Sequence, residues 1–145
     1  MTHLLIDTSV LIKWFHHQGE EGVEHALAIR AAHARGEVEA HMLDLAIYEV
    51  GNVLSRALRW SARDVVDQLD DLHEILGPTL GMSRAAIRAA ALLAETHTLS
   101  FYDASWAAAA REFDIVLVSD DRQLLNADLA ESPARFATRL RLHNG

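Results

Sequence analysis

Two short aliphatic segments, each followed at once by acidic residues and then by a helical pattern, most constrain how this chain can fold. Residues 3–6 precede Asp7, and residues 115–118 precede Asp120 and Asp121. Such runs are typical of buried strands, and an Asp directly after a strand is a favoured N-cap of a following helix. A strand-to-acid-to-helix unit near each end of the chain predicts a parallel sheet with helices on both faces.

The segments between these two units show mainly helical spacing. Apolar periodicity, capping residues and Gly or Pro breaks predict helices over residues 10–15, 20–35, 43–60, 61–76, 83–95 and 101–112. Short runs predict further strands over residues 39–42, 79–82 and 135–142. A length of 145 residues suits one core. We therefore expect one domain over residues 1–145, a three-layer α/β/α fold with a central, mostly parallel sheet.

Composition excludes several kinds of protein and site. The chain has no Cys, which excludes a disulfide framework, a thiolate zinc site and a cysteine nucleophile. No apolar run approaches the ~20 residues of a membrane span, and the N-terminus lacks the basic start of a signal peptide, so we expect a cytoplasmic protein. A formal net charge of -8 argues against broad attraction to nucleic acid unless several acids cluster around bound cations.

Four carboxylates are the candidate site residues. Ligands of open parallel sheets bind beyond the carboxyl ends of the strands, where Asp7 and Asp121 are expected. Glu49 lies on an apolar helix stripe, and Asp103 shares a face with Trp106 and two alanines of another helix, positions that are costly for an unpartnered acid. The alternatives are ordinary ones: a helix N-cap for the acids after the two strands, a side chain that reaches water at the stripe edge for Glu49, and a first-turn acid favoured by the helix dipole for Asp103.

Four acids without a Cys favour a hard cation such as Mg²⁺ or Mn²⁺, which prefers oxygen ligands. A metal held in this way suits phosphodiester hydrolysis, because it activates a water and stabilises charge on the phosphate. The hydroxyls of Thr8 and Ser119, next to these acids, are candidate supporting groups, with a turn or cap contact as the alternative.

The residues resemble the PIN domain. The resemblance rests on four segments that occur in the family's order and intervals and span nearly the whole chain, namely residues 5–11 (LIDTSVL), 49–50 (EV), 102–104 (YDA) and 119–125 (SDDRQLL). Among PIN proteins, a chain of this length is similar to the VapC toxins of type II toxin–antitoxin pairs. The resemblance implies a Mg²⁺- or Mn²⁺-dependent endoribonuclease, a homodimer, and inhibition by a VapB-like antitoxin that covers the acidic pocket.

The resemblance also implies residue roles. The metal-binding, catalytic acids would be Asp7, Glu49, Asp103 and Asp121. The family's last motif is a hydroxyl residue, a variable residue and then the Asp, which assigns the role to Asp121. Asp120 occupies the variable position, where it caps the helix or adds a nearby charge.

The remaining alternative is a non-catalytic PIN scaffold, which would bind a protein or RNA partner through the same surface. Two other classes fit the residues less well. A phosphoacceptor receiver domain expects a Lys after the last core strand, whereas Lys13 is the only lysine, and a haloacid-dehalogenase-like phosphatase expects an Asp where Ser9 stands. The nine histidines show no metal-ligand spacing, and we expect them to have surface or packing roles.

Overall fold

Three parallel strands form the centre of the protein. In the computed structural model, which describes residues 1–143, β1 (Thr2–Ile6) lies between β2 (Val38–His41) and β3 (Val116–Val118). Leu4 of β1 is in register with Ala40 on one side and with Val116 on the other. The last three residues of β1 are completely buried, as expected for a parallel strand covered on both faces.

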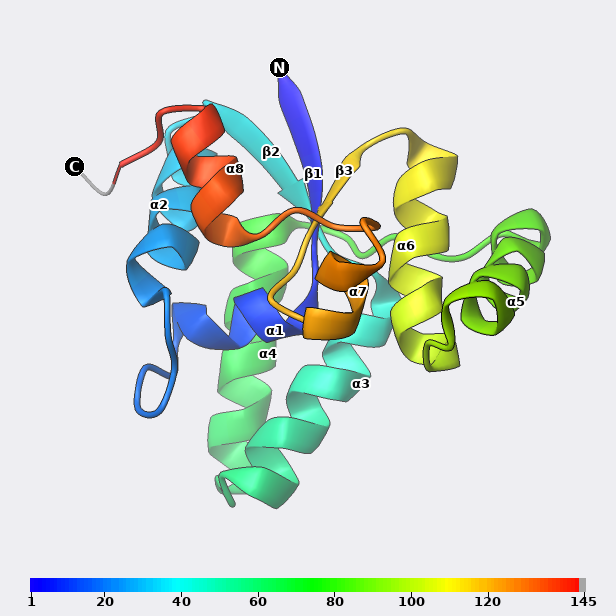
Figure 1. The fold of residues 1–145 in the computed structure, drawn as a ribbon. Coiled ribbons are helices and arrows are strands. Elements are labelled where there is room, and N and C mark those ends of the chain that lie inside the picture. Colours follow the sequence, from blue (N-terminus) through cyan, green and yellow to red (C-terminus); the bar gives the residue numbers. More distant parts are fainter. Residues whose placement is uncertain (144–145) are drawn as a thin grey trace.

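Helices cover both faces of this sheet. One layer contains α2 (Val23–Ala34) and α8 (Pro133–Arg139), and the other contains α5 (Arg84–His97) and α6 (Phe101–Phe113) (Figure 1). Residues 104–110 of α6 are buried throughout, and their alanines allow the helix to approach the sheet closely. The expected three-layer α/β/α fold with a parallel sheet is confirmed.

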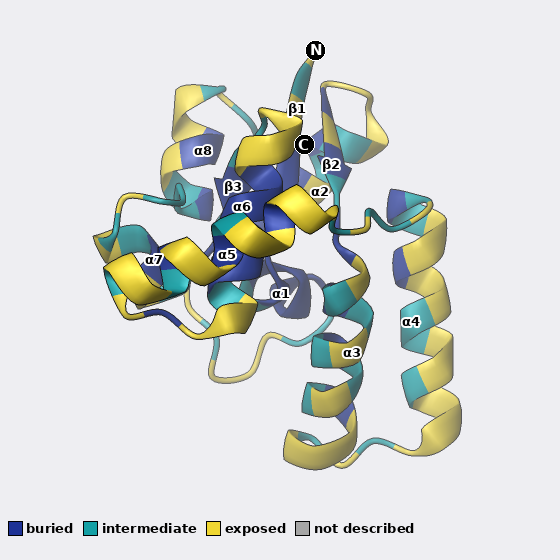
Figure 2. Cartoon of the chain, turned by 90° about the vertical axis from the view of Figure 1, so that its right-hand side faces the viewer, coloured by how far each residue is buried: buried dark blue, intermediate teal, exposed yellow. Residues whose placement is uncertain are grey.

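Each strand ends next to a helix that begins at the carboxyl edge of the sheet. β1 leads into α1 (Thr8–Leu11) and a 3₁₀ turn (Ile12–Trp14), β2 into α3 (Asp44–Asn52), and β3 into α7 (Arg122–Asn126). A π-helical turn (Val53–Ala57) extends α3, and α4 (Ala62–Leu76) returns beside it. The α3–α4 hairpin projects from the sheet, and much of α4 is exposed (Figure 2).

Two of the expected strands are corrected by the structure. Residues 135–142 do not form a strand, because Pro133–Arg139 is the helix α8: the Ser132 hydroxyl accepts the amide of Arg135, and Pro133 occupies the first turn. Residues 79–82 form only an isolated parallel bridge between Leu80 and Leu43 rather than a strand. The expected helices are present, although the first is only one α turn followed by a 3₁₀ turn. Within residues 1–143, no helix is long and apolar enough to cross a membrane.

Candidate functional site

The structure brings together the four acids that the sequence singled out, from four separate elements. Asp7 follows β1, Glu49 lies in α3, Asp103 in the first turn of α6, and Asp121 at the start of α7. The charges of Glu49 and Asp103 act on Asp7, and those of Asp121 and Glu49 act on Asp103. Figure 1 shows α1, α3 and α7 at the same end of the sheet. We call Asp7, Glu49, Asp103 and Asp121 the acid cluster.

Asp7 is the buried member of the cluster. It occupies the N-cap position of α1, yet its side chain caps no amide and only 5% of the residue is exposed. Its Oδ2 accepts hydrogen bonds from the hydroxyls of Ser119 at 2.6 Å and Ser9 at 3.0 Å. Burial raises the pKa of Asp7 to about 6, with smaller increases from Glu49 and Asp103 and opposition from the two serines. The capping alternative therefore does not describe this side chain.

The two serines tie the end of β1 to the segment after β3. Ser119 Oγ accepts the amide of Asp121 at 2.9 Å, and Ser9 Oγ accepts the amide of Asp120 at 3.0 Å. Each hydroxyl thus donates to Asp7 and accepts from the backbone opposite. Ser119 was among the expected supporting residues, whereas Ser9 was not. The signal for Ser9 was its position two residues after a strand-end Asp, within reach of the same carboxylate.

Glu49 is half-buried and held by two donors. Its Oε1 accepts hydrogen bonds from Thr8 Oγ1 at 2.9 Å and from the indole Nε1 of Trp106 at 3.0 Å. Thr8 therefore supports a carboxylate, as expected for a residue beside Asp7. Trp106 is fully buried, and its contact with Glu49 was not predicted from the sequence. A buried indole N–H needs a partner, and here that partner fixes the orientation of Glu49.

Asp103 is half-buried at the start of α6. Its backbone amide donates to the Ser100 hydroxyl at 3.0 Å, which fixes the first turn of the helix. Burial raises the pKa of Asp103 above its ordinary value. The nearby charge of Asp121 raises it further, and that of Glu49 does so less strongly. The pKa values of two members of the cluster are therefore raised partly because other members lie close by.

The adjacent acids Asp120 and Asp121 have different roles. Asp121 caps α7, because its Oδ1 accepts the amides of Gln123 at 3.0 Å and Leu124 at 3.1 Å. Asp120 instead pairs with the buried Lys13, with 2.6 Å between Oδ2 and Nζ. Lys13 also donates to the carbonyl of Glu21. The only lysine of the chain thus compensates Asp120 and leaves the acid cluster without a paired cation among the described residues.

The acid cluster fits a hydrated divalent cation. Its four side chains offer only oxygen ligands, and their mutual repulsion is relieved when a cation lies between them. No three of the four carboxylates bring oxygens within 4.8 Å of one another. Mg²⁺ keeps several waters and binds few carboxylates directly, so this spacing agrees with a cation that retains part of its hydration.

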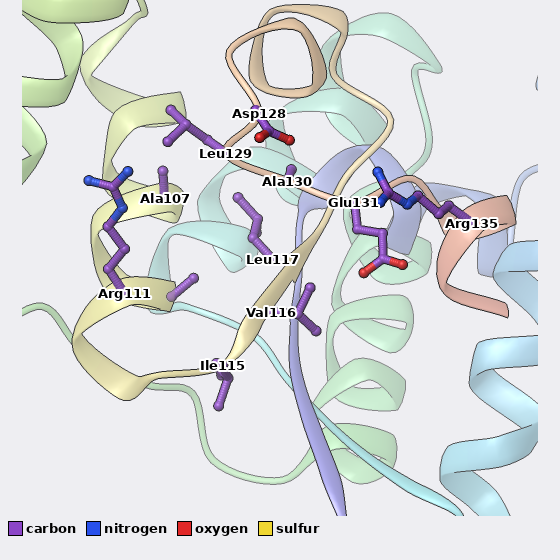
Figure 3. Close-up of a pocket in the computed structure, with 11 residues that line it drawn as sticks. Ala107, Arg111, Ile115, Val116, Leu117, Asp128, Leu129, Ala130, Glu131 and Arg135 are labelled. Atoms are coloured by element: carbon purple, nitrogen blue, oxygen red, sulfur yellow. The ribbon is translucent and has the colours of Figure 1, made fainter. Parts of the chain in front are cut away.

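A separate cavity of about 270 Å³ lies at the β3 edge of the sheet. Figure 3 shows Glu131 and Arg135 on one side of it and Arg111 on the other. No member of the acid cluster lines it. Glu131 closes the sheet edge, since its amide donates to Leu117 and its carbonyl accepts the amide of Ser119 at 3.0 Å. This contact fixes Ser119 from the side opposite Asp7 and so contributes to the site indirectly.

The fold and site define an α/β protein with carboxylates gathered at the carboxyl edge of a parallel sheet. The sequence model of the PIN domain matches residues 4–129, and the chain belongs to the PIN domain family. The family resemblance drawn from the four sequence segments is confirmed. A comparison with curated proteins gives no match.

Solved structures share the fold over most of the chain. The protein is similar to PAE2754 from Pyrobaculum aerophilum, with 26% identity, a TM-score of 0.67 and 97% of each chain covered. It is also similar to a chain of a toxin–antitoxin complex from Klebsiella pneumoniae, at 16% identity and a TM-score of 0.61, covering 90% of this chain and 97% of that one. The protein is similar as well to FitAcB from Neisseria gonorrhoeae, at 20% identity and a TM-score of 0.59, covering 90% of this chain and 98% of that one. The latter two, at such identities, show the fold alone.

Proposed function

We propose that this protein is a divalent-metal-dependent endoribonuclease and the toxin of a type II toxin–antitoxin pair. The observation that carries the proposal is that four carboxylates from separate elements lie close together: the charges of Glu49 and Asp103 act on the buried Asp7, and that of Asp121 acts on Asp103. Membership of the PIN domain family, whose members are generally nucleases, supports the same activity. Mg²⁺ or Mn²⁺ is the cation that such a donor set favours.

The protein's own side chains orient the carboxylates of the acid cluster. Two serine hydroxyls orient the carboxylate of Asp7, and Trp106 and Thr8 orient that of Glu49. The acid cluster would hold the cation. When bound, the cation would supply an activated water and stabilise negative charge on the RNA phosphate. Since the pKa of Asp7 lies near 6, this carboxyl of the metal-free protein holds its proton in weak acid and becomes ionised towards neutral pH.

An antitoxin is the expected protein partner. The Klebsiella pneumoniae relative in fold comes from a toxin–antitoxin complex, which supports a partner of that kind here. An Arg of the partner would suit the acid cluster through bidentate pairing with carboxylates. Large apolar side chains are exposed on several helices, as at surfaces that other chains cover. Those on α3, α5 and α6 include Tyr48, Ile87, Leu92, Phe101 and Tyr102. We propose that such surfaces serve the antitoxin and a second copy of the chain.

The competing function is a non-catalytic scaffold, favoured by the formal charge of -8. Cleavage of total cellular RNA separates the two functions. Purified protein free of antitoxin is incubated with RNA in Mg²⁺, in Mn²⁺ and in EDTA. The variants are Asp7→Asn and, as a matched control, Asp70→Asn on the exposed face of α4.

The proposal expects cleavage by the wild type and by Asp70→Asn only when metal is present, and none by Asp7→Asn. Undiminished cleavage in EDTA or by Asp7→Asn would refute the role of the acid cluster. Folded protein that binds Mn²⁺ but cleaves no RNA would instead favour the scaffold.

A further inference from the structure

A second group of potential metal ligands lies on one face of the neighbouring strands β1 and β2. His3 in β1 is in register with Glu39 in β2, and Leu5 is in register with His41. Side chains alternate between the two faces of a strand, so His3, Glu39 and His41 project from the same face. His3 and His41 are 38 residues apart in sequence, which explains why local spacing gave no sign of the group.

The distances in this group match those between ligands of one metal ion. His3 Nδ1 lies 3.1 Å from His41 Nε2 and 3.5 Å from Glu39 Oε2, and all three ligand atoms lie within 4.8 Å of one another. Bond lengths of about 2.0–2.2 Å in a tetrahedral site place neighbouring ligand atoms roughly 3.3–3.6 Å apart. The two imidazoles are stacked with an interplanar angle of 10°. Rotation about the Cβ–Cγ bonds, which is soft in histidine, would turn both lone pairs towards one ion.

We propose that His3, Glu39 and His41 form a binding site for a borderline divalent transition metal such as Zn²⁺, Ni²⁺ or Co²⁺. Two imidazoles and one carboxylate suit these ions, whereas Mg²⁺ prefers an all-oxygen set. The metal would join β1 to β2 and stabilise the folded state, since the three ligands are brought together only by the folded sheet. This inference does not depend on the proposed nuclease activity.

The surroundings leave the group accessible to a metal. A cavity of about 430 Å³ is lined by both histidines and by Asp114, so water or a further carboxylate can complete the coordination. His33 is excluded as a ligand because its Nδ1 accepts the amide of Ala40 and its Nε2 donates to the carbonyl of Ile75.

The two metal sites are separate in place and in chemistry. Along the strand direction, His3 lies four residues before Asp7, and His41, in register with Leu5, lies two residues before it, which corresponds to about 13 Å and about 7 Å at roughly 3.3 Å per residue. A metal at one site therefore shares no ligand with the other, and excess Mg²⁺ can keep the acid cluster filled while the histidine site is titrated.

The test is isothermal titration of untagged protein with Ni²⁺ in excess Mg²⁺. The wild type is expected to bind one Ni²⁺ per chain, and His41→Gln to bind it at least about 100-fold more weakly, because even partners of ligands contribute 10- to 100-fold. The matched control is His25→Gln, because His25 lies 3.5 Å from Glu24 without a second imidazole. It should bind as the wild type does.

Thermal unfolding provides a second readout. Zn²⁺ should raise the Tm of the wild type and of Asp7→Asn, but not that of His3→Gln, which changes an exposed side chain and tests the site even if His41→Gln does not fold. Equal Ni²⁺ binding by the wild type and both histidine variants would overturn the proposal. Loss of Ni²⁺ binding in Asp7→Asn alone would also overturn it, since the ion would then belong to the acid cluster.

Discussion

Replacing Asp7 by Asn should stabilise the metal-free protein at neutral pH. The pKa of this carboxyl rises from 3.8 to about 6 in the folded state, chiefly through burial. The difference, at roughly 1.4 kcal/mol for each pH unit, means that ionised Asp7 costs the folded state about 3 kcal/mol. Asn carries no charge, and its side-chain oxygen can accept from Ser9 and Ser119 in place of Oδ2.

The stabilisation expected from Asp7→Asn should increase with pH. Because the folded-state pKa exceeds the unfolded one, the folded protein binds more protons between pH 3.8 and about 6, and this group makes stability fall as pH rises through that window. Below the window the carboxyl is neutral in both states and the cost disappears. The gain from Asp7→Asn should therefore be about 1 kcal/mol at pH 4.5 and about 3 kcal/mol at pH 7.5.

Urea unfolding in EDTA at these two pH values measures the effect. A gain of about 3 kcal/mol corresponds to a Tm increase of roughly 10 °C in a chain of this size. Asp70→Asn, at an exposed helix position, should stay within about 0.5 kcal/mol of the wild type. The reasoning is refuted if Asp7→Asn is no more stable at pH 7.5, or if its gain is the same at both pH values.

Three further substitutions separate site effects from fold effects. Trp106→Phe removes a donor to Glu49 and should cost about 1–2 kcal/mol in urea unfolding and slow RNA cleavage; unchanged cleavage would show that the indole does not position Glu49. Lys13→Met leaves Asp120 without its cation and should cost about 1–3 kcal/mol, less than a fully buried pair because Asp120 is partly exposed; a stability equal to that of the wild type would count against the ion pair. Gly77→Ala strains a residue at φ 75° and ψ -161°, a region that is essentially restricted to Gly, and should cost about 1–3 kcal/mol without changing the cleavage rate per folded molecule; no measurable loss of stability would contradict that backbone geometry.

The sequence was most informative where local pattern and tertiary environment agree. β1 and β3 could be predicted because the buried part of each parallel strand is an uninterrupted aliphatic run, and the acids after them because a carboxylate there is costly without a partner. Glu49 could be predicted for a similar reason, as an acid on an apolar helix stripe. These features are local in the sequence even though the site that they form is not.

Features that depend on the tertiary fold could not be predicted in the same way. The apolar and basic residues of 135–142 suit both a strand and a helix. The helix α8 forms because Ser132 caps it and Pro133 occupies its first turn. The indole of Trp106 meets Glu49 across 57 residues of sequence, and His3 meets His41 across 38. Such partners become visible only when the sheet register and helix packing are known.

The most direct test of the acid cluster is the position of Mn²⁺ in crystals of the wild type, measured by anomalous diffraction. The account predicts an anomalous peak between Asp7, Glu49, Asp103 and Asp121 that is absent from crystals of Asp7→Asn. Crystals of the wild type that show no peak there at a Mn²⁺ concentration that supports RNA cleavage would contradict the account.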